Sequence, residues 1–194
     1  MRSLLCALVL LVTALPLRAE ERSFDLGFAH PGMEQSQFRA GQWADGRVIC
    51  SNDADYPPEV EFTLPKGVAR VGAVRCGLYS QDQAAHWHIM PAIMAGWPGE
   101  VWAMFIPDEA GALRLVQLKL VLPEAAFDDL AQSWGQLFGL PSFRRDQVVH
   151  WTNARNDAAI IGDSGGGAYV HAYLLDNALH TSANRRLGQM PARH

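Results

Sequence analysis

The chain has 194 residues, a formal net charge of −4 and a hydrophobic fraction of 49%. This length and apolar content suit one globular domain, or two small ones, with a buried core, and they argue against a disordered chain. An acidic sequence without a cluster of Lys and Arg is a poor candidate for binding nucleic acid or an anionic membrane surface.

The first nineteen residues have the pattern of a secretory signal peptide. Arg2 supplies a positive charge, residues 4–15 form an apolar run, and Ala19 is a small residue at the expected cleavage point. The run is too short to span a bilayer. We therefore expect a periplasmic or secreted protein that begins at Glu20 and has no membrane span. Cleavage removes two positive charges, Arg2 and Arg18, and changes the net charge from −4 to −6.

Two cysteines remain after cleavage, because Cys6 lies inside the signal segment. Export places Cys50 and Cys76 in an oxidising compartment, where an isolated pair is most simply one disulfide. The bond would close a loop of about 26 residues and contribute on the order of 3 kcal/mol to stability. The alternative is two buried free thiols.

The region before residue 80 predicts one short helix and three strands. The helix is expected over residues 33–39, and the strands over residues 47–50, 60–64 and 71–79. Residues 60–64 alternate in polarity and are expected at an edge of the sheet, beside residues 71–79. Residues 80–100 show no clear pattern, because prolines interrupt them.

The stretch from residue 101 to residue 121 predicts a hairpin of two central strands. Residues 101–106 are apolar enough to be buried on both faces, and residues 107–111 form a tight connection. The returning strand, residues 113–121, alternates. Regular alternation would place Leu115 and Gln117 on one face and Val116 and Leu118 on the other.

An amphipathic helix is predicted from Pro123 to Phe138. Pro123 suits the first helical position, and Gly139 favours a stop. Apolar residues recur at helical spacing and predict one buried stripe. The stripe consists of Phe127, Leu130, Ala131, Trp134, Leu137 and Phe138.

Three further strands, over residues 146–153, 158–163 and 168–175, predict a meander, and residues 176–186 predict a short terminal helix. Antiparallel strands beside segregated helices indicate an α+β fold, with the helix at 123–138 packed on one face of the sheet. We expect a single domain over residues 20–194. Because the order helix-then-strands occurs twice, it could consist of two tandem modules, residues 20–99 and 100–194.

The stretch from the helix, LPEAAFDDLAQSWGQLFGLP, through VVHWTN to AAIIGD resembles small exported α+β modules. These are exemplified by the outer-membrane assembly lipoprotein BamE and by tandem beta-lactamase-inhibitor proteins. Residues 31–38 resemble the Gly-Met start of such a module. The chain lacks their lipid-bearing cysteine. The resemblance implies a non-catalytic binding or assembly role and transfers no site residue.

The sequence Gly162-Asp163-Ser164-Gly165-Gly166 matches the nucleophile motif of chymotrypsin-like serine proteases. By resemblance, Ser164 would be the nucleophile, His86 the base and Asp108 the orienting acid. The spacing between His86 and Ser164 is too short for the two barrels of such an enzyme, and the helix at 123–138 lies where barrel strands are needed. We therefore favour a glycine-rich hairpin turn and no catalytic residue.

His86 and His88 form a second candidate site. In an extended segment, residues two apart point to the same side, so both imidazoles could bind one metal ion. Thioether sulfur from Met90 or Met94 beside the imidazoles would favour copper in an exported protein, and zinc is the other candidate metal. Two histidines are only half a site. Completion would require His30, His150 or His171 to lie nearby, and a surface pair without a bound metal is the alternative.

Trp87 and Trp97 lie in the proline-interrupted region, where exposed aromatic residues often mark a recognition surface. Filling of the core is the competing interpretation. Together these observations predict an exported, non-catalytic binding or assembly protein whose partner is another protein or an envelope component. Metal binding through His86 and His88 is the alternative, and a serine hydrolase using Ser164 is a more distant one.

Overall fold

The structure is a computed structural model that describes residues 24–43, 46–163 and 167–189. Within these residues, ten strands form one antiparallel sheet, and four α-helices pack against it. This confirms the predicted α+β class. The predicted signal segment and Ser164 lie outside the described residues.

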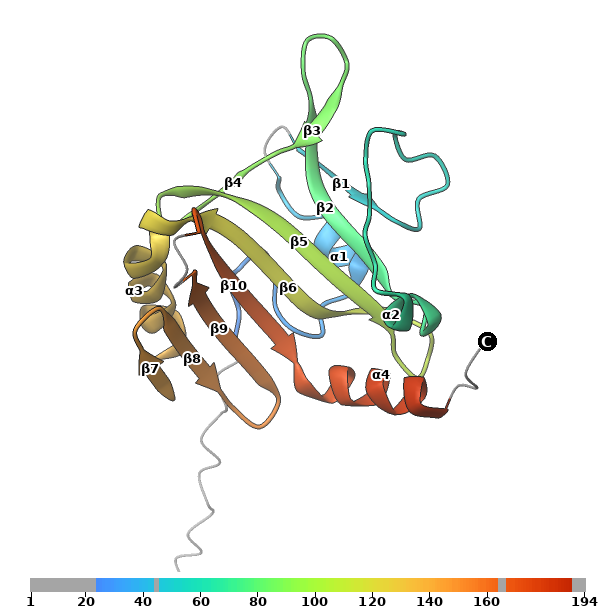
Figure 1. Ribbon diagram of the computed structural model, residues 1–194. Coiled ribbons are helices and arrows are strands. Elements are labelled where there is room, and N and C mark those ends of the chain that lie inside the picture. Colours follow the sequence, from blue (N-terminus) through green and yellow to red (C-terminus); the bar gives the residue numbers. More distant parts are fainter. Residues whose placement is uncertain (1–23, 44–45, 164–166, 190–194) are drawn as a thin grey trace, which may run out of the picture.

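The strands of the sheet are joined mostly by short connections. They are β1 Arg47–Cys50, β2 Val74–Gln81, β3 Trp87–Ile89, β4 Ala92–Met94, β5 Trp97–Pro107, β6 Leu113–Pro123, β7 Phe143–Arg145, β8 Val148–Thr152, β9 Asn156–Gly162 and β10 Tyr169–Asp176. Their order is β1-β2-β5-β6-β10-β9-β8-β7, with β3 added to β2 and β4 added to β5. β5, β6 and β10 therefore lie at the centre of the sheet, and the β2–β3 hairpin projects beyond it (Figure 1).

Helices cover both faces of the sheet. They are α1 Gln35–Arg39, α2 Lys66–Arg70, α3 Phe127–Phe138, preceded by a 3-10 turn Glu124–Ala126, and α4 Asn177–Gln189. α1 and α3 contribute Phe38, Leu130 and Trp134 to the large core on one face. α2 and α4 pack together on the other face and contribute Val68 and Ala183 to a smaller core. Figure 1 shows α4 following β10 and ending near α2.

The strand β6 does not alternate regularly, because it contains a β-bulge. Phe105 lies opposite Leu115 and Met104 lies opposite Gln117, so Val116 is the extra residue. As a result Leu115 and Leu118 both face the large core, while Val116 belongs to the smaller core on the other face. The prediction that Leu115 and Gln117 share a face was therefore wrong.

The predicted edge strand at residues 60–64 is also wrong. These residues form no strand. Pro57 and Pro58 precede the segment and Pro65 follows it, and proline lacks the N–H group that a ladder requires. The segment instead crosses one face of the sheet, where Val60 and Phe62 pack in a small cluster around Ile49 and Tyr79. It thus covers the sheet rather than extending it.

The helix α3 begins later than predicted, since Pro123 is the last residue of β6. It ends as expected at Gly139, which has a φ of 90°. Its buried face contains Phe127, Leu130, Ala131, Trp134 and Phe138. Leu137 was predicted on this stripe but is 48% exposed.

The predicted meander is present as β8, β9 and β10, and it joins the first part of the chain directly because β10 pairs with β6. The boundary between the two possible modules, at residues 99 and 100, falls inside β5. Among the helices of the described residues, none has the length and apolar content needed to span a bilayer.

Candidate functional site

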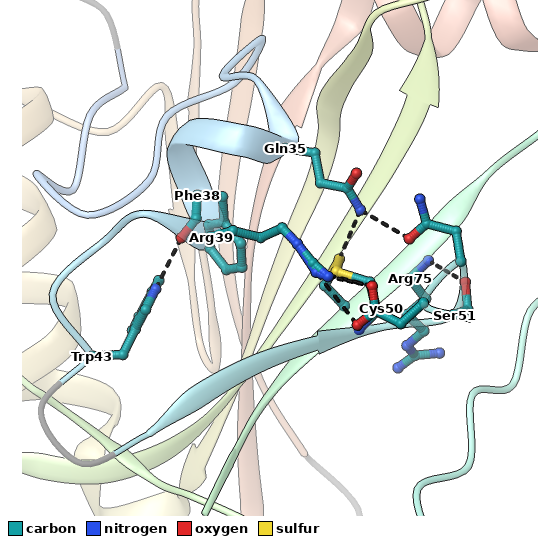
Figure 2. Close-up of a disulfide and its surroundings, with 10 residues drawn as sticks. Gln35, Phe38, Arg39, Trp43, Cys50, Ser51 and Arg75 are labelled. Atoms are coloured by element: carbon teal, nitrogen blue, oxygen red, sulfur yellow. Dashed lines mark hydrogen bonds and ion pairs between the residues drawn. A yellow bond between two sulfur atoms is a disulfide. The ribbon is translucent and has the colours of Figure 1, made fainter. Parts of the chain in front are cut away.

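The disulfide between Cys50 and Cys76 is present, as predicted, and it joins β1 to β2 at directly opposed positions. Both cysteines have no exposed surface. Figure 2 shows the side chain of Gln35, from α1, directed at the bond, with Nε2 at 3.5 Å from Cys76 Sγ and 3.2 Å from Asn52 Oδ1.

A charged pair, Arg39 and Asp53, lies beside the disulfide, at the loop that follows β1. Asp53 accepts hydrogen bonds from the Arg39 guanidinium and, through Oδ2 at 3.0 Å, from the backbone N–H of Cys50. Arg39 is the last residue of α1, so the contact fixes this helix to β1. The disulfide and its neighbours therefore form a structural staple.

The histidine pair lies at the projecting β2–β3 hairpin, and each imidazole has its own neighbour. His86 Nδ1 is 3.7 Å from Asp82 Oδ2, and His88 Nε2 is 3.0 Å from the Ser80 hydroxyl. The backbone N–H of His86 holds the pKa of Asp82 below its usual range, and the N–H of Ala84 and the two imidazoles act in the same direction.

The three additional histidines proposed for a metal site form no group with the pair, and the Nδ1 atom of His30, in the segment before α1, lies 3.1 Å from the carbonyl oxygen of Pro31. His150 is on β8, 3.4 Å from Asp157, and His171 is on β10, whereas His86 and His88 are beside β2 at the other side of the central strands. In the residues that the structure describes, no group of three or more His, Cys, Asp or Glu side chains could hold a metal ion.

The two tryptophans proposed as an interface are both half-buried. Trp87 packs against the cluster of Ile49, Val60 and Tyr79, and the Arg47 guanidinium lies 5.8 Å from the centre of its ring. Trp97 donates from Nε1 to Asp129 Oδ2 at 2.8 Å and so connects β5 to α3. Their role as an interface stays a prediction.

Of the three residues of the protease-like motif, the two that the structure describes do not lie together. Asp108 follows β5 beyond the start of β2, and His86 lies beyond the end of β2. The length of β2 separates them, roughly 23 Å at 3.3 Å per residue. Asp108 is instead bound by Arg114 Nε at 3.0 Å, and this bond is the main reason that its pKa lies below its usual range.

A cleft on the α2–α4 face of the sheet is a further candidate site, which was not among the sites predicted from the sequence. Its volume is about 270 Å³. It crosses four neighbouring strands and is closed on one side by the segment that leads into α2. The lining residues are Leu64, Pro65, Val68, Arg75, Trp102, Ala103, Met104, Gln117, Lys119 and Tyr173. We call it the sheet cleft.

The polar side chains of the sheet cleft are positioned by the ladder. Lys119 on β6 lies directly between Trp102 on β5 and Tyr173 on β10. Arg75 on β2 donates to the carbonyl of Thr63 at 2.8 Å, and its guanidinium lies 4.7 Å from the centre of the Trp102 ring. Two cations, two aromatic rings and the amide of Gln117, all carried by strands of the sheet, thus converge in the cleft.

Partial burial changes the titration of groups in and beside the cleft. It raises the pKa of Tyr173, so the hydroxyl remains a donor over the physiological range. Burial, and then the charge of Lys119, lower the pKa of the neighbouring His171, whose Nδ1 has no hydrogen-bond partner. The Tyr173 hydroxyl is therefore a neutral donor beside the charged groups of Arg75 and Lys119 in the cleft.

One signal in the sequence points to the sheet cleft. Gln117 and Lys119 are polar and two residues apart in the otherwise apolar stretch 115–122 of a central strand, which places both on one face. The remaining members come from β2, β5, β10 and the segment before α2, and only the pairing of these strands brings them together.

Comparison with known proteins gives no further assignment. No protein-family model, curated protein or solved structure matches the chain.

Proposed function

We propose that this protein is an exported, non-catalytic binding protein that holds an envelope component in the sheet cleft. The observation that carries the proposal is the convergence of Arg75, Gln117, Lys119 and Tyr173 in one concave site. A concave site with an apolar wall and a few convergent polar groups is the usual form of a ligand pocket.

The construction of the cleft supports binding rather than chance packing. Its polar groups lie on central strands, and sites on regular elements are held more rigidly than sites on loops. In the described residues, the side chains of Gln117, Lys119 and Tyr173 form no hydrogen bond or ion pair with other residues. Partly buried polar groups of this kind gain from a ligand that supplies their partners.

Export is supported by two independent features. The N-terminal sequence has the charge, apolar run and small residue of a cleavable signal, and the disulfide is of the kind that persists in oxidising compartments. The resemblance to BamE-like and beta-lactamase-inhibitor modules adds a non-catalytic binding role to this proposal.

The proposal is tested by isolating the protein with its ligand. The chain, with its own leader, would be produced in a Gram-negative host, purified from the periplasmic fraction and analysed by native mass spectrometry. We expect a mature N-terminus at Glu20 and a bound mass that is released chemically unchanged on denaturation. Gln117→Trp fills the cleft and should remove that mass.

The matched control is Thr152→Trp, which adds the same side chain at an exposed position of β8 outside the cleft. It should retain the bound mass, and circular dichroism would verify that both variants fold. A bound mass that persists in Gln117→Trp, or a ligand that the protein converts to another compound, would contradict the proposal.

A further inference from the structure

The charge of the sheet cleft is opposite to that of the protein. The chain carries a net charge of −4, yet Arg75 and Lys119 line the cleft and, among the described residues, no Asp or Glu lines it. Lys119 is a partly exposed residue and has no carboxylate partner in the described part of the chain. Its ammonium group is therefore available to pair with an incoming anion.

Arg75 is positioned to share such an anion. Its bond to the Thr63 carbonyl uses one of the five N–H donors of the guanidinium, and stacking on Trp102 fixes the plane of the group. Glu100, on the same strand as Trp102, forms no ion pair with Arg75 in the described part of the chain, and its Oε2 accepts the indole N–H of Trp102 at 2.9 Å. A fixed guanidinium with free donors suits a carboxylate or a phosphate.

The other side of the cleft is apolar. Leu64, Pro65 and Val68 lie before and within α2, and Met104 lies on β5 beside them. The volume of about 270 Å³ is just below the range of about 300–1,000 Å³ for small-molecule pockets, so the ligand is short. A ligand that matches both sides carries a negative group at one end and a short apolar body at the other.

We propose that the sheet cleft binds a small amphipathic anion, with its carboxylate or phosphate between Arg75 and Lys119 and its apolar body against Val68 and Met104. This inference rests on the proposed function, since it names the ligand class for the same site. Two sources share the chemistry: a short fatty acid and the phosphate of a lipid head group.

The inference is tested with four probes that have the same eight-carbon chain. Octanoate and octyl phosphate are the anions, octanol is neutral, and octyltrimethylammonium is cationic. Binding to the mature protein would be followed by NMR through the indole N–H of Trp102, assigned by comparison with Trp102→Phe. We expect the better anion to bind about tenfold more tightly than octanol, the gain expected from a charge-assisted hydrogen bond.

Substitutions in the cleft test whether the preference for anions arises there. Lys119→Met keeps a long apolar side chain but removes the charge, and it should weaken the better anion about tenfold while changing octanol little. Tyr173→Phe removes one hydroxyl group and should weaken the same anion to a smaller extent. Arg145→Gln, an exposed cation on β7, is the control and should change nothing.

The two anions separate the possible sources. Tighter binding of octanoate indicates a fatty acid, and tighter binding of octyl phosphate indicates a lipid phosphate. Either result supports the inference. The inference is overturned if octanol or octyltrimethylammonium binds as tightly as the better anion. It is also overturned if Lys119→Met leaves anion binding unchanged.

Failure here is distinguishable from failure of the proposed function. If a co-purified ligand is lost in Gln117→Trp but neither anionic probe binds, the ligand class is wrong and the binding role stands. If anions bind but no cleft-dependent ligand accompanies the protein from the periplasm, the proposed function is wrong although the anion site is real.

Discussion

At the scale of single residues, the wall of the sheet cleft depends on a close contact between Gly77 and Trp102. The two residues are directly opposed on β2 and β5, and a Cβ atom at Gly77 would lie 3.0 Å from Trp102 Cζ3. The indole can therefore rest on the bare backbone, with Arg75 over its ring and Tyr79 at 6.3 Å in an edge-to-face arrangement. Because glycine has no side chain, it leaves the space that the ring occupies.

The first prediction concerns the pH dependence of Tyr79. Burial raises its pKa to about 12 from 10.0; the Arg75 charge opposes the shift and Glu100 adds to it. Because the folded pKa lies above the unfolded value, the contribution to stability is complete below pH 10 and is lost as the pH rises through about 12. We expect the thermal midpoint to fall over this window.

The measurement combines tyrosinate absorbance with thermal unfolding at alkaline pH. Tyr79→Phe keeps the ring and should remove the ionisation near pH 12 together with part of the stability loss. Tyr56→Phe changes an exposed ring and should leave this late ionisation in place. An unchanged titration in Tyr79→Phe would show that another tyrosine is responsible.

At the scale of elements, α3 is held to the sheet by its aromatic residues. Trp134 is 2% exposed and lies 5.9 Å from Trp151 of β8 and 5.3 Å from Phe138, measured between ring centres. Trp151 donates from Nε1 to the carbonyl of Gly139, where the helix ends. One aromatic cluster thus fixes both the face of α3 and its C-terminus.

The second prediction compares two positions on α3. Trp134→Ala should lower the free energy of unfolding by about 3–5 kcal/mol, because it removes a large buried ring and leaves a cavity. Leu137→Ala, at a position 48% exposed, should cost no more than about 1 kcal/mol. Urea denaturation of both variants measures the difference. Equal costs would mean that α3 does not pack as the structure shows.

At the scale of the whole molecule, the fold is one continuous sheet in which the two halves of the chain meet through β6 and β10. Seven residues of β10 pair with β6, and β5 pairs with the opposite edge of β6. The disulfide fixes the β1–β2 end of this sheet, where only four residue pairs join the strands. A short ladder at this end makes the covalent staple important.

The third prediction is that replacing both cysteines, Cys50→Ala with Cys76→Ala, destabilises the protein without changing its fold. Opening a loop with a sequence separation of 26 should lower the free energy of unfolding by about 3 kcal/mol, mainly by giving the unfolded chain more freedom. Urea unfolding measures the loss, and circular dichroism should show the native β-sheet signal. A double variant as stable as the wild type would contradict this role.

The sequence by itself determined the elements whose patterns are local. The helical spacing of Phe127, Leu130 and Trp134 predicts α3, and Gly139 predicts its end, because side-chain burial and backbone freedom act over a few residues. The disulfide was predicted from the two cysteines that follow the predicted signal segment, and it is present. The meander of β8, β9 and β10 followed from alternation and turn residues.

Only the tertiary structure decided which faces meet. The bulge at Val116 reverses the alternation of β6 and places Val116 in the smaller core. Residues 60–64, which lie between prolines, pack across the sheet around Ile49 and Tyr79 instead of joining it. The sheet cleft has the same origin. Gln117 and Lys119 were visible as polar residues in an apolar strand, but Arg75 and Tyr173 come from β2 and β10. They reach the same site through long-range strand pairing, which depends on the global packing of the chain rather than on local spacing.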